Sequence, residues 1–199
     1  SDNLTPADDL AFSALNVTVR DLIQSHDAKG NPFVDKLGAH LLPELLDAAL
    51  CPDMPSARRR ELMDVAVALV VDHRRGAKCA VELTKLLKSD GYAAPAAADA
   101  IAELAHPDDS LAAFVSLMYT SRDFACQARV ASMISKLVAR AGLDEGDAGR
   151  AFESVDKGGF ARLVLAARRV ESPVAFARDV CSFVRAFNAA KGREATGVT

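Results

Sequence analysis

Prolines and glycines divide this chain into helix-length segments, and this punctuation constrains the fold more than any other feature of the sequence. Three dipeptides place an N-cap side chain directly before a proline that suits the first helical position: Thr5-Pro6, Asn31-Pro32 and Ser172-Pro173. Four glycines follow periodic apolar stretches, where a left-handed C-terminal cap would lie: Gly76, Gly91, Gly142 and Gly192. Signals that start a helix and signals that stop one therefore alternate along the chain.

The segments between these signals predict helices nearly throughout. Their expected ranges are 6–26, 32–50 with a break or kink at Pro43, 55–75, 77–90, 95–106, 108–120, 122–141, 147–156, 159–171 and 173–191. The last of them is the most clearly amphipathic, because it carries an apolar stripe at helical spacing: Phe176, Val180, Phe183, Val184 and Phe187.

One segment, ELMDVAVALVVD at residues 61–72, is rich enough in valine to form a buried strand. We reject a strand because helix signals bound the apolar stretch at both ends, and because no second strand-like segment is present to pair with it. A helix that is apolar on nearly every side must be surrounded by other helices. The sequence therefore predicts an all-α fold, a multi-helix bundle of about nine to ten helices around a central buried helix at about residues 60–73.

We expect residues 1–191 to form a single α-helical domain and residues 192–199 to form a frayed C-terminal tail. The alanine-rich stretch GYAAPAAADAIAELA leaves a subdomain seam near residues 90–96 open as an alternative. The chain has 199 residues, of which 50% are hydrophobic and 26% are charged, and this composition is typical of a folded protein with one good core.

The net charge of −3 argues against bulk electrostatic binding to nucleic acid or to an anionic membrane. No stretch reaches the roughly 18 uninterrupted apolar residues of a membrane span. The four cysteines are too widely scattered to place two thiolates on one metal ion: Cys51, Cys79, Cys126 and Cys181. We expect free thiols packed like small apolar residues, which favours a reducing compartment such as the cytoplasm.

A triple arginine precedes the valine-rich segment and is the first candidate binding site. Positive charge at a helix N-terminus is disfavoured by the helix dipole, so another cause must keep it there. At helical spacing Arg58 can reach Glu61, and Arg60 can reach Asp64, whereas Arg59 has no obvious partner. The triplet is then either a solvated surface or a contact for an anionic or acidic protein partner.

A second basic pattern lies near the C-terminus, where arginines recur every seven residues. Seven residues are close to two helical turns, so Arg162 and Arg169 share one side of their helix, as do Arg178 and Arg185. If the last two helices form a hairpin, these sides could merge into one basic face. Nucleic acid would also require aromatic residues among the arginines, and the aromatic residues here follow buried patterns.

Signals for catalysis, metals and cofactors are weak. The histidines are not paired at helical spacing, and no phosphate loop, metalloprotease motif or nucleophile elbow is present: His26, His40, His73 and His106. We therefore predict no catalytic residue, no metal site and no cofactor. A helical enzyme whose buried cysteine and histidine meet in space stays open as an alternative.

The sequence favours an α-helical protein–protein interaction module, of adaptor, effector or scaffold type, that binds a macromolecular partner through helix faces. Nucleic-acid binding by the C-terminal basic face is the main alternative, and self-association into a homo-oligomer is a further one. The predicted partner-binding residues are Arg58, Arg59, Arg60, Arg162, Arg169, Arg178 and Arg185.

Overall fold

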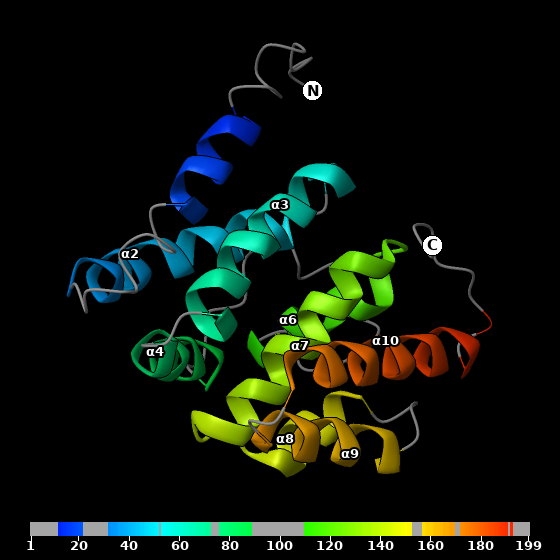
Figure 1. Cartoon of the computed structure of the whole chain (residues 1–199). Coiled ribbons are helices and arrows are strands. Elements are labelled where there is room, and N and C mark those ends of the chain that lie inside the picture. The colour runs from blue at the N-terminus through cyan, green and yellow to red at the C-terminus, as the bar shows by residue number, and fades with distance from the viewer. Residues whose placement is uncertain are drawn as a thin grey trace.

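The computed structural model describes residues 12–21, 32–51, 53–72, 76–88, 110–152, 157–169, 172–190 and 192. Residues 12–21 form one helix, and the others are α2 (Pro32–Leu50), α3 (Ser56–Val67), α4 (Gly76–Lys88), α6 (Ser110–Thr120), α7 (Phe124–Arg140), α8 (Glu145–Ala151), α9 (Lys157–Arg168) and α10 (Pro173–Ala190). A π-helical segment, η1 (Ala68–Asp72), directly continues α3. No β-strand occurs among the described residues, so the predicted all-α, multi-helix fold is confirmed (Figure 1).

Proline and glycine set several helix boundaries where the sequence predicts them. α2 begins at Pro32 and α10 begins at Pro173, and the Oγ of Ser172 accepts a hydrogen bond from the backbone N–H of Ala175 at 3.2 Å. Gly142 follows α7 with a φ of 74°, a left-handed conformation that glycine adopts without strain. These local signals therefore set the first residue of α2 and of α10 and the end of α7.

No break interrupts α2 at Pro43, although the sequence predicts a break or kink there. Proline removes one backbone hydrogen bond from a helix, but Leu42 and Leu46 are buried on either side of it, and their packing holds the helix together. The predicted helix at 95–106 and the seam near 90–96 lie outside the described residues. Of the predicted tail, the structure describes only Gly192.

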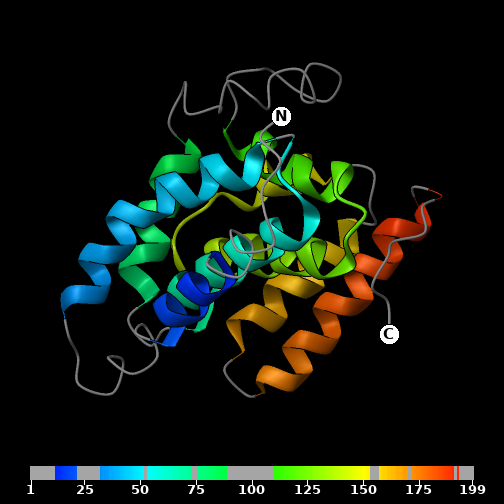
Figure 2. The ribbon, with the colours of Figure 1, turned by 90° about the horizontal axis from the view of Figure 1, so that it is seen from above.

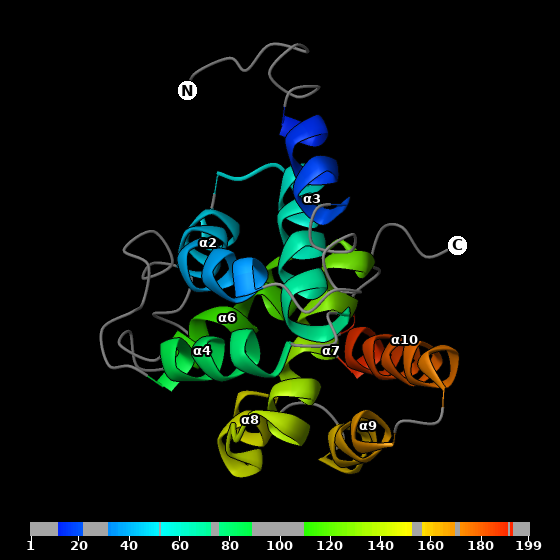
Figure 3. The ribbon, with the colours of Figure 1, turned by 60° about the vertical axis from the view of Figure 1, so that its left-hand side comes forward.

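The central helix of the bundle is α7, whereas the sequence predicts residues 60–73 for that position. It packs against α3, η1, α4, α6, α8, α9 and α10 (Figure 3). The valine-rich segment is helical, as predicted, and Leu69 is fully buried, but Arg60 is exposed and Asp64 is only partly buried on its outer side. Charged residues spaced along α3 give that helix a solvent side, whereas α7 is buried over most of its circumference.

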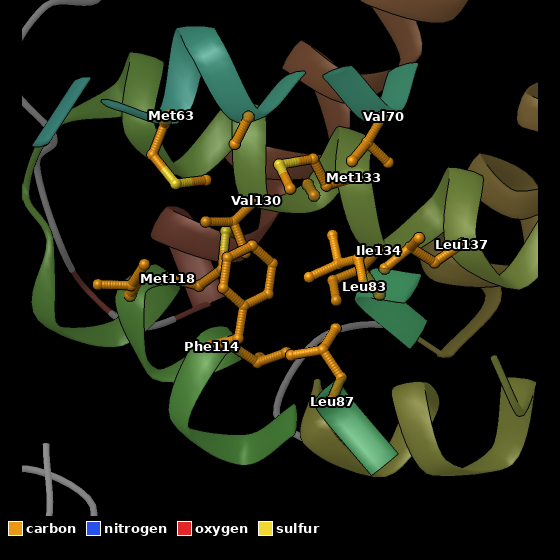
Figure 4. Packing of buried hydrophobic residues seen from close by; sticks show 14 of the residues in the cluster. Met63, Val70, Leu83, Leu87, Phe114, Met118, Val130, Met133, Ile134 and Leu137 are labelled. Atoms are coloured by element: carbon orange, nitrogen blue, oxygen red, sulfur yellow. The ribbon is translucent and has the colours of Figure 1, made fainter. Parts of the chain in front are cut away.

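A single hydrophobic cluster extends from α2 to α10 and surrounds α7. Figure 4 shows Val130, Ile134 and Leu137 of α7 among side chains from α3, η1, α4 and α6. At the other side of α7, Phe152 and Phe183 meet edge to face with their ring centroids 5.5 Å apart. Because α9 and α10 also pack against α7, the core joins both helices to the rest of the bundle.

A buried pair of amides fixes α10 against α7. The Nε2 of Gln127 donates to the Oδ1 of Asn188 at 3.0 Å, and the Nδ2 of Asn188 donates back to the Oε1 of Gln127 at 2.8 Å. The same Nε2 is also within hydrogen-bond distance of the carbonyl oxygen of Met118, at 2.9 Å. A shift of α10 along α7 would leave these buried groups unpaired, so the pair sets the axial position of α10.

Candidate interaction surface

The triple arginine lies at a junction of several helices. Arg59 is 9% exposed, and it donates from Nε to the carbonyl oxygen of Ala49 at 2.9 Å and from Nη2 to that of Cys51 at 2.8 Å. Ala49 lies in the last turn of α2 and Cys51 directly follows this helix, where the last carbonyl groups lack helical partners and attract positive charge. Arg59 therefore caps α2, a role that side-chain spacing does not reveal.

Arg60 pairs with Asp123 in place of the expected Asp64. Its Nε lies 3.1 Å from the Oδ2 of Asp123, and Asp64 in turn pairs with Arg129 of α7. Two ion pairs of opposite orientation thus cross the contact between α3 and α7. The sequence spacing suggested pairs within one helix, but the partners lie on the neighbouring helix.

Asp123 is also the N-cap of α7, because its Oδ1 accepts a hydrogen bond from the backbone N–H of Cys126 at 2.9 Å. Burial alone would raise the pKa of the Asp123 carboxyl, but the hydrogen bonds from Arg60 and from the Cys126 backbone lower it below its ordinary value. The hydrogen bond to Asp123 raises the pKa of the Arg60 guanidinium. This carboxylate is a structural element that the sequence analysis missed, although an aspartate just before a helix is a recognisable signal.

Arg58 lies against the helix at residues 12–21, its guanidinium 5.1 Å from the centre of the Phe12 ring. The same helix is held by Glu61, which accepts hydrogen bonds from Ser13 at 2.7 Å and from Asn16 at 3.2 Å. Contacts within the fold thus account for Arg58, Arg59 and Arg60. Their binding to a partner stays a prediction, and we leave them out of the surface described next.

The second basic pattern lies on a helical hairpin. α9 and α10 run side by side, pack against each other and both pack against α7 (Figure 2). Their inner sides are buried, and the four predicted arginines are exposed: Arg162, Arg169, Arg178 and Arg185. The last two helices thus form a hairpin that carries all four arginines, and the merging of their arginine sides into one basic face stays a prediction.

Two large aliphatic side chains are exposed beside these arginines. Leu165 of α9 is 50% exposed and Val174 of α10 is 79% exposed. Neither was identified from the sequence, although both lie on the helix sides opposite the buried stripes. We call the set Arg162, Leu165, Arg169, Val174, Arg178 and Arg185 the hairpin surface.

Charge is unevenly divided between the hairpin and the remainder of the chain. Residues 157–190 contain six Lys or Arg and two Asp or Glu, so they carry +4, which leaves −7 on the other residues of a chain whose net charge is −3. Arg185 lies over the ring of Phe124, its guanidinium 5.8 Å from the ring centre, and two further cations of the hairpin lie near carboxylates. Arg178 is 77% exposed and lies 3.7 Å from Asp179, and Arg168 lies 3.6 Å from Glu145.

The aromatic residues of the hairpin face inward. Phe160, Phe183 and Phe187 are buried, and the ring of Phe176 lies beneath the ammonium group of Lys136 at 4.5 Å. Among the described residues of α9 and α10, no aromatic ring is exposed for stacking on a base. The hairpin surface is thus cationic and aliphatic.

The groups considered for catalysis are placed as follows. Cys126 is buried, and burial raises the pKa of its thiol, which keeps the sulfur protonated. His40 is exposed on α2, and the other histidines lie outside the described residues. Within the described ranges, no group of three or more His, Cys, Asp or Glu side chains is arranged to hold a metal ion.

None of the described helices is both long and apolar enough to cross a bilayer. The chain matches no known protein family, and neither a curated protein nor a solved structure shows significant similarity to it.

Proposed function

We propose that this protein is a helical protein–protein interaction module that binds an acidic partner protein through the hairpin surface. The observation that carries the proposal is the alternation of exposed arginines with exposed aliphatic side chains on α9 and α10. Long-range attraction by the arginines would bring an acidic partner to the surface, and burial of Leu165 and Val174 would then stabilise the complex.

The same features favour a protein over a nucleic acid. An exposed valine gains little from contact with a phosphate backbone, whereas it gains from burial against a protein side chain. Stacking platforms that bind single strands are built from exposed aromatic rings, and the rings in the described part of the hairpin are covered. The net charge of −3 on the whole chain would also oppose binding of a long polyanion.

A capture experiment with charge-reversed variants tests this function. The tagged chain is used to capture proteins from its native host, and the triple variant Arg162→Glu, Arg169→Glu, Arg178→Glu is used in parallel. The matched control reverses three exposed cations outside the hairpin: Lys78→Glu, Lys85→Glu and Arg140→Glu. Circular dichroism confirms that both variants are folded.

We expect a protein partner that the wild-type chain and the control capture and that the hairpin variant does not. Digestion of nucleic acid in the lysate should leave this capture unchanged. Equal recovery by the hairpin variant and the control, or recovery that depends on intact nucleic acid, would contradict the proposal.

A further inference from the structure

The helix at residues 12–21 is attached to the outside of the bundle. It lies beside α3, at the edge of the molecule away from α8 and α9 (Figure 3). None of its residues is buried, whereas more than half of α7 is. Phe12 and Val19 are partly buried and pack on the core, but Leu15 is 62% exposed and Val17 is 47% exposed. Little apolar surface therefore holds this helix in place.

The polar attachment of this helix converges on one carboxylate of α3. Ser13 donates to the Oε1 of Glu61 at 2.7 Å, and Asn16 donates from Nδ2 to the Oε2 at 3.2 Å, so both oxygens bind the helix. Ser13 and Asn16 are three residues apart and therefore lie on one side of their helix. Arg58, one turn before Glu61, meets the ring of Phe12, and its Nη2 atom is buried. One short part of α3 thus makes all of these contacts.

Loss of these contacts does not require the core to repack. Isolated helices shorter than about 12–15 residues are marginal in water, so a segment as short as 12–21 is helical because it is docked. No side chain of this segment is buried in the core, so undocking removes only the segment's own contacts. Glu61 is half-buried, and it is not stranded when its donors leave, because water reaches it and Arg58 lies within side-chain reach three residues earlier.

We infer that helix 12–21 is a movable cover on α3, which undocks as a unit while the bundle stays folded, and that Glu61 sets the balance between the two states. Local opening of this kind occurs where buried apolar contacts are few. The docked helix places the Phe12 ring against Arg58, one of the predicted partner-binding residues, so access of a partner to that guanidinium depends on the motion. The motion takes place on α3 and not on α9 or α10, so it is independent of the proposed function.

Native-state hydrogen exchange of the full chain tests this inference. The amides of residues 12–21 are compared with those of α7 at several low urea concentrations, because local opening exposes little surface and responds weakly to denaturant. Glu61→Ala removes the acceptor, and its matched control is Glu82→Ala, which removes a glutamate of α4 that pairs with Lys85 at 2.8 Å. Gln127→Leu weakens the bundle itself, since it breaks the buried amide pair between α7 and α10.

We expect the amides of residues 12–21 to be protected, but at least about tenfold less than those of α7, and to respond little to urea. Glu61→Ala should speed their exchange about tenfold, because two hydrogen bonds to a charged, half-exposed acceptor are lost, whereas the control should not. Gln127→Leu should speed exchange in α7 and leave residues 12–21 unchanged, because the amide pair is intact in both the docked and the undocked state.

A second set of variants keeps the test independent of α3. Ser13→Ala with Asn16→Ala should match the effect of Glu61→Ala, and combining all three should add nothing, because the same two hydrogen bonds are already absent. Acceleration of residues 12–21 by Gln127→Leu would overturn the inference, since the helix would then open only when the bundle unfolds. So would an absence of protection in the wild-type segment, or a response to Glu61→Ala no larger than the response to Glu82→Ala.

Discussion

Asp123 performs two structural tasks with one carboxylate, and substitutions can separate them. Its Oδ1 caps α7 through the backbone N–H of Cys126, and its Oδ2 pairs with Arg60 of α3. Asp123→Ala removes both interactions. Asp123→Asn keeps the cap, because asparagine is an N-cap as good as aspartate, and removes only the charge.

The magnitudes follow from burial. Loss of an N-cap side chain costs about 1 kcal/mol. The ion pair is worth about 0.5–1 kcal/mol, because the Arg60 side chain is 45% exposed and solvent screens it, although Asp123 is only 5% exposed. Asp123→Ala should therefore lower the free energy of unfolding by about 2 kcal/mol, and Asp123→Asn by about 0.5–1 kcal/mol.

Urea denaturation followed by circular dichroism measures both values, and the double variant with Arg60→Gln completes a cycle that isolates the pairwise energy. The pH dependence provides a further check. The pKa of Asp123 is lower in the folded chain than in the unfolded chain, so its stabilising effect is complete above the unfolded pKa of about 4 and is lost as the pH falls through the folded pKa. The difference between wild type and Asp123→Asn should shrink over that range.

Two results would refute this reasoning. An Asp123→Ala variant no less stable than Asp123→Asn would mean that the side chain does not act as a cap. A pairwise energy of zero between Arg60 and Asp123 at neutral pH would mean that the ion pair makes no net contribution.

Three further substitutions address other contacts. Arg59→Met should destabilise the chain by about 2–3 kcal/mol in urea denaturation, because it leaves the carbonyl groups at the end of α2 without a donor; a cost below that of an exposed Arg→Met change would contradict the capping role. Gln127→Leu should cost about 1–3 kcal/mol by stranding the amide of Asn188, and adding Asn188→Leu should recover part of the loss, whereas additive costs would show that the two amides act independently. Gly38→Ala should destabilise by about 1–3 kcal/mol, because a Cβ there would clash with the Sγ of Cys79, and Cys79→Ala should relieve it in thermal unfolding; no relief would place the strain elsewhere.

Local signals in the sequence were enough to predict most of the described helices, although α4 begins at Gly76, which the sequence predicts as the cap that ends the preceding helix. Pro32 and Pro173 begin α2 and α10, because a ring-fixed φ and an absent N–H suit only the first turn. The long apolar run at residues 61–72 was also correctly interpreted as helical. Such features depend on neighbours within a few positions, which is the range over which a sequence is directly informative.

Contacts between helices were harder to predict. Arg59 bonds to backbone carbonyls that carry no residue-specific signal, and Asp64 pairs with Arg129, which is 65 positions away. The central place of α7 likewise depends on how the chain crosses itself, since apolar content alone favoured the valine-rich segment. On the hairpin, the arginine spacing was visible because it is local, whereas the exposure of Val174 follows from which side of α10 meets α7.

The concentration of cations on the hairpin has a consequence for encounters in solution. Residues 157–190 carry +4, and α9 and α10 lie together at one edge of the molecule in Figure 1. An approaching acidic molecule is drawn toward this edge before any atoms touch. The rate of productive collision should therefore fall as added salt shortens the range of that attraction.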